Sequence, residues 1–178
     1  MVKMRNHTYA LSICAMFTAV TAVLSQISVP LPFTPVPINL ATFAVFVAGG
    51  LLGPVYGAIS LIVYAALGTV GLPIFAQFTG GVGIIVGPTG GYILGYISAA
   101  WLTGLLINHL PKNIWSSVLA MSAGMLSCYL LGTVWFMVQQ KVDLLAALGM
   151  CVVPFLIGDA IKIVLAAFTV KAVSRLVR

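Results

Sequence analysis

The chain has 178 residues, of which 62% are hydrophobic and only 6% are charged. A soluble domain carries roughly 25% charged residues, so this composition excludes an ordinary soluble protein and predicts an outer surface that faces lipid. The net charge of +6 does not indicate nucleic-acid binding, because the basic residues lie mostly at the chain ends and in short loops rather than on one polar face.

Hydrophobic runs, taken in chain order, predict an all-α integral membrane protein with six transmembrane helices in a single domain, residues 1–178. A crossing helix needs about 20 residues, so no room remains for a separate soluble domain. Proline and glycine mark the ends of the runs. The expected helices are residues 9–26, 38–52, 53–71, 89–108, 114–138 and 145–173, the last with bends at Pro154 and Gly158.

Two of the connections have unusual composition. The first holds Pro30, Pro32, Pro35 and Pro37, which predicts a stiff, extended segment. The second, residues 75–91, is rich in glycine and carries no charge. Non-helical chain at membrane depth is tolerated where it is buried in protein or lines a cavity. We therefore expect both loops to border a binding site.

The distribution of Lys and Arg predicts the orientation in the membrane. With six crossings both chain ends share one side, and that side would hold all the basic residues outside the helix cores except one: Lys3, Arg5, Lys112, Lys171, Arg175 and Arg178. The opposite side holds Lys141, which Asp143 balances. By the positive-inside rule both termini are cytoplasmic, and the proline-rich and glycine-rich loops are external.

The sequence contains no pattern typical of an enzyme. It lacks G-x-S-x-G, H-E-x-x-H and the G-K-[ST] of a phosphate-binding loop, and its three cysteines show no C-x-x-C spacing. We expect no catalytic residues, no metal and no cofactor. ATP hydrolysis, if the function needs it, is expected from another protein.

The strongest functional signal is the pair Asp159 and Lys162. Their i, i+3 spacing places them on one face of the last helix, among apolar neighbours. A charge inside the membrane costs on the order of 3 kcal/mol or more and usually marks a binding site or pathway, although a purely structural ion pair would have the same spacing. The further ligand-binding candidates are external polar or glycine residues: Asn39, Gln77, Thr89, Gly91 and Tyr92.

Two rows of small residues predict close helix packing. One is Gly87, Gly91, Gly95 and Ala99 at the start of the fourth helix, which we expect to pack inside the chain. The other is Ala15 and Ala19 on the first helix, where internal packing and docking of a partner helix are both open.

These residues together resemble the BioY family, the biotin-capturing membrane components of energy-coupling-factor (ECF) transporters. The resemblance rests on PVPINLATFAVFVAGGLLGP, GLPIFAQFTGGVGIIVGPTGGYILGY and PFLIGDAIKIVLAA, which run in matching order from about Pro35 to Ala167. It implies high-affinity biotin capture from outside the cell, in the plasma membrane of a prokaryote. The alternatives are capture of another vitamin and a membrane scaffold that transports nothing.

The resemblance also implies partners and roles for particular residues. The partners would be a transmembrane coupling protein and two ATPase subunits, with Ala15 and Ala19 matching the face that docks the coupling protein. Asp159 and Lys162 look like ligand contacts. Many members have Gln where this chain has Ala41, so a polar ligand contact at position 41 is not expected here.

Overall fold

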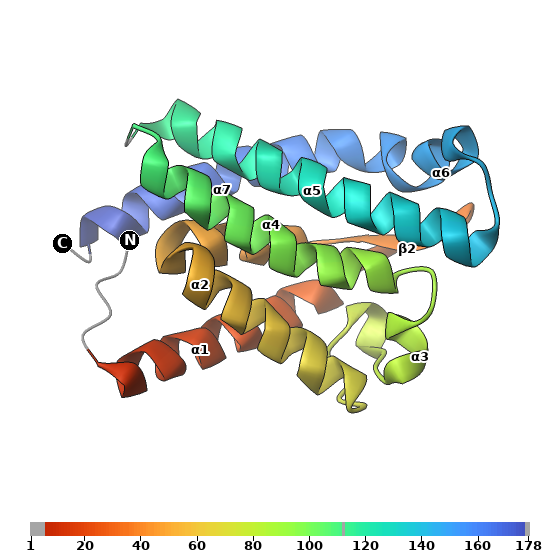
Figure 1. The fold of residues 1–178 in the computed structure, drawn as a ribbon, viewed down its shortest axis with the longest axis horizontal. Coiled ribbons are helices and arrows are strands. Elements are labelled where there is room, and N and C mark those ends of the chain that lie inside the picture. Colours follow the sequence, from red (N-terminus) through yellow and green to blue (C-terminus); the bar gives the residue numbers. More distant parts are fainter. Residues whose placement is uncertain (1–5, 112, 177–178) are drawn as a thin grey trace.

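The chain folds into a bundle of helices that run along one common direction (Figure 1). The structure is a computed structural model and describes residues 6–111 and 113–176. Its helices are α1 (His7–Gln26), α2 (Ala41–Thr69), α3 (Val82–Ile85), α4 (Gly90–His109), α5 (Ile114–Gln140), α6 (Leu144–Cys151) and α7 (Leu156–Leu176). Two strands, β1 (Ser28–Leu31) and β2 (Thr34–Asn39), and two 3-10 turns, η1 (Ala76–Phe78) and η2 (Val153–Phe155), complete the described fold.

Six passes through the bundle arise because α2 is folded back on itself. Five segments of the described chain are long and apolar enough to cross a membrane, and α2 counts as one of them although Gly53 inside it has a left-handed φ of 81°. The two legs of α2 pack closely, since a Cβ on Gly57 would lie 3.0 Å from the Cα of Gly49. The six predicted crossings are confirmed, and α1 begins at the end where α7 finishes (Figure 1).

The predicted helix ends are right to within a few residues, with two informative differences. The second helix begins at Ala41 rather than at Ile38, because residues 38 and 39 belong to β2. The last predicted helix is interrupted at η2, where Pro154 lies, and Gly158 instead lies inside the regular helix α7. Proline breaks the helix because it cannot donate the backbone hydrogen bond and its ring clashes with the preceding turn.

The proline-rich connector is extended, as expected, but it is also paired. β1 and β2 form an antiparallel hairpin in which Ser28 faces Asn39 and Val29 faces Ile38. The ladder is irregular between Val29 and Leu31, at Pro30, which has no N–H to contribute. A small two-stranded sheet therefore accompanies an otherwise helical fold.

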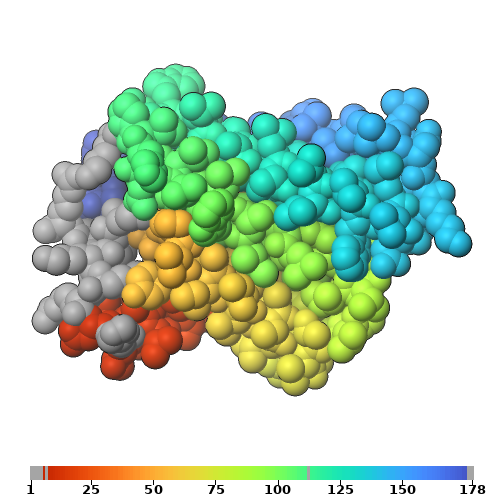
Figure 2. Space-filling view, viewed as in Figure 1, coloured from red at the N-terminus to blue at the C-terminus, as the bar shows by residue number. Residues whose placement is uncertain are grey.

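Glycine allows the helices to approach until their backbones touch. A Cβ on Gly95 of α4 would lie 3.1 Å from the Cα of Cys128 in α5, and one on Gly124 of α5 would lie 2.8 Å from the carbonyl oxygen of Ala99. The predicted internal packing of Gly91, Gly95 and Ala99 is confirmed, while Gly87 precedes α4. In space-filling form α4 lies between α5 and the second leg of α2 on the visible face (Figure 2).

The described basic residues lie where the orientation requires them. Lys171 and Arg175 are at the end of α7, and Lys141 and Asp143 are in the turn between α5 and α6 at the opposite end of the bundle. Lys3, Arg5, Lys112 and Arg178, which also entered the prediction, lie outside the described residues. The bias places the α1–α7 end in the cytoplasm and the hairpin and glycine-rich segment outside.

We predict that Gly104→Ala destabilises the bundle while Gly149→Ala does not. A Cβ on Gly104 of α4 would lie 2.5 Å from the backbone of Gly53 and of Pro54, which cannot move aside as a side chain would. Overpacking of this kind costs about 1–3 kcal/mol. A Cβ on Gly149 of α6 meets nothing within 4 Å. Gly149→Ala is therefore a control that replaces a helical glycine by alanine without a clash.

The measurement is thermal unfolding of each purified variant in detergent, followed by circular dichroism. Gly104→Ala should melt at a clearly lower temperature than the parent chain, and Gly149→Ala at the same temperature or slightly higher, because alanine favours the helix. Equal melting temperatures for the two variants would show that the contact between α4 and the α2 kink is not tight.

Candidate ligand-binding site

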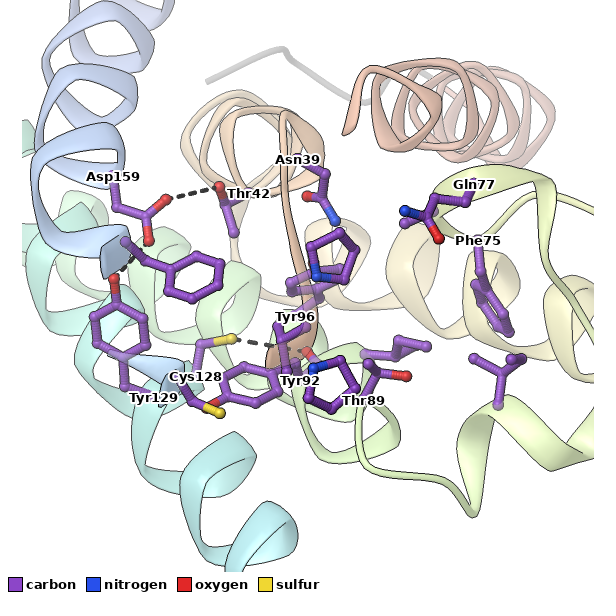
Figure 3. Close-up of a pocket in the computed structure, with 18 of the residues that line it drawn as sticks. Asn39, Thr42, Phe75, Gln77, Thr89, Tyr92, Tyr96, Cys128, Tyr129 and Asp159 are labelled. Atoms are coloured by element: carbon purple, nitrogen blue, oxygen red, sulfur yellow. Dashed lines mark hydrogen bonds between the residues drawn. The ribbon is translucent and has the colours of Figure 1, made fainter. Parts of the chain in front are cut away.

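A cavity of about 200 Å³ is lined in part by β2 of the hairpin and by the glycine-rich segment (Figure 3). Its walls come from β2, α2, α4, α5 and α7, together with the segment around η1 and the η2 turn. Aromatic and aliphatic side chains make up most of the lining, and a few polar groups converge on one wall. The principal lining residues are Asn39, Thr42, Tyr64, Phe75, Gln77, Thr89, Tyr92, Tyr96, Cys128, Tyr129, Cys151, Phe155, Asp159 and Lys162.

The charged wall of the cavity is an ion pair on α7. Lys162 Nζ lies 2.8 Å from Asp159 Oδ1, and the two residues are only 6% and 3% exposed. This is the one ion pair among the residues that the structure describes. Each charge compensates the other at a depth where a single charge would be costly.

Thr42, at the start of α2, closes a triangle with the pair. Its hydroxyl accepts a hydrogen bond from Lys162 Nζ at 3.2 Å and lies 3.4 Å from Asp159 Oδ1, to which it donates. The triangle therefore links α2 to α7, and it fixes the direction of the lysine head group. Figure 3 shows Thr42 and Asp159 approaching each other from the two helices.

Tyr129 of α5 holds the second carboxylate oxygen. Its hydroxyl donates to Asp159 Oδ2 at 2.5 Å, the short length expected of an O–H···O⁻ bond. Asp159 thus accepts from three side chains on three helices, namely Thr42, Tyr129 and Lys162. Its position is set before any ligand arrives.

The pair retains a small, directed capacity for hydrogen bonding. An ammonium group has three N–H donors, and Lys162 uses two of them, on Asp159 and Thr42. A carboxylate has about four acceptor positions, and Asp159 uses three. One donor on Lys162 and one acceptor position on Asp159 Oδ2 therefore remain, on a site whose net charge is zero.

Aromatic rings form the opposing walls. Tyr64 and Phe75 pack edge to face with ring centroids 5.4 Å apart, and the Tyr92 hydroxyl lies 3.2 Å from that of Thr133. Tyr96 lies beside Tyr92 on α4 and points into the same space (Figure 3). These walls suit the flat, apolar faces of a ring system, as most small-molecule pockets do.

The glycine-rich segment lines the outer part of the cavity with Gln77 and Thr79. Gln77 and its neighbour Phe78 both have a left-handed backbone, with φ of 60° and 55°, which is unusual for residues other than glycine. The Phe78 N–H donates to Gln26 Oε1 of α1 at 2.8 Å. The side chain of Gln26 thereby helps to hold this strained turn against the bundle.

Six of the seven predicted ligand-binding residues line this cavity: Asn39, Gln77, Thr89, Tyr92, Asp159 and Lys162. Gly91 does not. A Cβ there would lie 2.2 Å from the Cβ of Trp135, so Gly91 packs α4 against α5. Ala41, where no polar ligand contact is expected, is fully buried, and its N–H donates to Asn39 Oδ1 at 3.0 Å.

Sequence reasoning missed the residues that support the pair. Thr42 and Tyr129 lie in apolar runs where one polar side chain carries no signal of its own, and only the spatial arrangement connects them to Asp159. The cysteines are buried and free, and Cys128 and Cys151 also line the cavity. No cluster of three or more metal-ligating side chains occurs within residues 6–111 and 113–176.

Comparisons with known proteins agree with this arrangement. The sequence pattern of the BioY family matches residues 1–178. A biotin transporter BioY from Thermotoga maritima is 39% identical over 161 residues, covering 90% of this chain and 92% of that protein. A biotin transporter BioY from Rhodobacter capsulatus is 31% identical, and the match covers 92% of each chain.

A solved structure is also similar. It is the S-component for biotin from an ECF-type ABC transporter, which superposes with a TM-score of 0.89 at 30% identity and covers 97% of this chain and 95% of its own. The match therefore extends over the helices, the hairpin and the glycine-rich segment together. From its sequence and its fold, this chain is a member of the BioY family, a multi-pass protein of the prokaryotic cell membrane.

Proposed function

We propose that this chain captures biotin on the outer side of the membrane as the substrate-specific subunit of an ECF-type, ATP-driven uptake system. The observation that carries the proposal is the buried, neutral Asp159–Lys162 pair at one wall of an aromatic cavity, in a chain of the BioY family. A scaffold without a ligand would have no use for such a pair beside an aromatic cavity. A capture subunit for another vitamin would need a different set of polar groups.

Biotin matches the cavity in its separate parts. Its ureido ring offers neighbouring N–H donors and a carbonyl acceptor, and the pair offers one acceptor on Asp159 and one donor on Lys162. Its thioether ring needs apolar walls, which Tyr92, Tyr96 and Phe155 supply. Pockets of this kind gain affinity from the apolar walls and selectivity from the few polar groups.

The charge of the pair favours one orientation of the ligand. Lys162 is already neutralised by Asp159, so a carboxylate placed against it would leave a net negative charge in a buried site, which is costly. The neutral ureido ring adds no charge. We therefore assign the ureido ring to the pair and the carboxylate of biotin to the outer end of the cavity, near Gln77 and Thr79.

Energy for transport would come from partner proteins, because the chain has no phosphate-binding loop of its own. The proposed partners are a transmembrane coupling protein and two ATPase subunits. Ala15 and Ala19 are exposed on α1, whose inner face is anchored to α2 through Thr18, which donates to the carbonyl of Ser60 at 2.8 Å. The alanines therefore do not pack inside the chain, which supports the docking interpretation over the internal one.

The function is tested by calorimetric titration of the detergent-purified chain with biotin, thiamine and riboflavin. Of these three vitamins, only biotin should bind. Biotin amide should retain affinity to within about tenfold, because the carboxylate would lie at the outer end, whereas 2-iminobiotin, which replaces the ureido oxygen, should lose more. Binding of thiamine or riboflavin instead would identify another vitamin, and no binding at all would favour a scaffold.

We predict that either single change in the pair weakens biotin binding. Asp159→Asn removes a charged acceptor and Lys162→Met a charged donor, and hydrogen bonds to charged groups contribute roughly 1.5–3 kcal/mol. Biotin affinity should fall by about ten- to a hundredfold in each variant. The measurement is biotin titration of each variant beside its melting temperature.

A combined variant separates binding from folding. Each single change leaves one buried charge uncompensated, whereas the double change removes both, so folding stability should partly return while binding does not. Near-native biotin affinity in either well-folded single variant would show that the pair is only structural.

We further predict that Ala15→Trp and Ala19→Trp reduce biotin uptake by cells that contain the complete transporter. Biotin affinity of the isolated variants should stay within about twofold of the parent chain, because neither alanine lines the cavity. Ala172→Trp, at an exposed alanine on α7, is the matched control and should leave both properties unchanged. A parallel loss of affinity in the α1 variants would contradict the docking role.

A further inference from the structure

A second cavity lies at the opposite end of the bundle, between the ends of α4 and α7, the start of α5 and the first leg of α2. Its volume is about 460 Å³, larger than that of the cavity described above. Ile107 and Val170 give it an apolar floor, while Asn108, Ser116 and Ser174 contribute polar groups. This is the end that the positive-inside bias places in the cytoplasm.

Two cations also line this cavity. Lys171 and Arg175 are four residues apart on α7 and so lie on one helical face. The whole chain has only two acidic residues. Asp143 caps α6 at the far end of the bundle, where its carboxylate accepts from the Ala146 N–H at 3.2 Å, and Asp159 is paired with Lys162. No side-chain carboxylate of this chain is placed to balance the two cations.

The positive-inside rule explains the charges but not their surroundings. It requires only that Lys and Arg face the cytoplasm, whereas here they border a hollow that also presents hydroxyl and amide groups. An anion with several oxygens can accept from such donors together, and phosphate is the group that guanidinium and ammonium ions recognise in this way. The chemistry of the cavity therefore fits a phosphate group.

The depth of the cavity indicates where that phosphate comes from. Trp115 directly precedes Ser116 of the cavity wall and is 78% exposed, and exposed tryptophans gather at the level of the lipid head groups. An apolar floor below a basic rim matches the change from acyl chain to head group. Basic pockets between transmembrane helices on the cytoplasmic side bind anionic lipid head groups.

We propose that this second cavity binds the head-group phosphate of an anionic phospholipid from the cytoplasmic leaflet. Lys171 and Arg175 hold the phosphate, and the acyl chains continue along the lipid-facing surface of the bundle. Ser174 lies between the two cations in sequence, and its hydroxyl donates to the backbone carbonyl of Lys171 at 3.0 Å. The site is independent of the ligand cavity, which shares none of its residues.

The test is native mass spectrometry of the full chain titrated with phosphatidylglycerol or phosphatidylcholine. One molecule of phosphatidylglycerol should bind at least about tenfold more tightly than phosphatidylcholine, and Lys171→Gln or Arg175→Gln should remove about that factor. Lys141→Gln makes the same charge change at the external end and should leave the affinity within about twofold. Ser174→Trp fills the cavity without changing charge and should also abolish the preference.

The following outcomes of these measurements would contradict the proposal. An equal loss in Lys141→Gln, or full binding in Ser174→Trp, would show diffuse surface attraction rather than a site. Inorganic phosphate should compete only weakly, and if it binds as tightly as phosphatidylglycerol the ligand is a soluble phosphate and not a lipid. Lys171 and Arg175 variants that bind lipid normally but fail to transport would assign this surface to a partner protein. Melting temperatures of all variants report whether they fold.

Discussion

The hydrogen-bonded ion pair between Asp159 and Lys162 is the constraint to which the neighbouring helices conform. A single charge at that depth costs on the order of 3 kcal/mol or more. Lys162 bonds only to Asp159 Oδ1, so Lys162 alone would leave Asp159 Oδ2 without a hydrogen bond. Thr42 from α2 and Tyr129 from α5 supply the missing bonds. The site is therefore complete only when α2, α5 and α7 are assembled, and its shape is a property of the whole bundle.

That assembly depends on how closely the helices can approach. Lipid tails are as apolar as the helix surfaces, so association inside a membrane relies on tight packing and on polar contacts. Gly49 lies against the backbone of Ala100, and Gly95 lies against that of Cys128, which brings α2 and α5 to opposite sides of α4. The small residues thus fix the spacing between the walls of the cavity, and the polar triangle at Thr42 fixes the position of α7.

The sequence predicts the helices and the pair because both produce strong local signals. A long apolar run interrupted by proline or glycine has few alternatives, and two opposite charges at i, i+3 in such a run must share a face. Tyr129 gives no such signal, because its role depends on contact with a residue thirty positions away. Gly91 fits two predictions, a ligand contact and a member of the row of small residues, and the sequence does not decide between them; in the structure it packs against Trp135. The hairpin was missed because its prolines hide the alternation typical of strands.

The scarcity of acidic residues connects the two ends of the molecule. Of the two carboxylates, Asp143 caps α6 at the external end and Asp159 neutralises Lys162 inside the bundle. No side-chain carboxylate remains for Lys171 and Arg175, which lie at the end of the bundle where water and lipid head groups are available. The resulting excess of positive charge at one end orients the chain in the membrane. That orientation turns the hairpin and the glycine-rich segment toward the outside of the cell. The distribution of charge therefore has two effects: it leaves the ligand site neutral, and it makes the external side of the membrane the side from which a ligand enters the cavity.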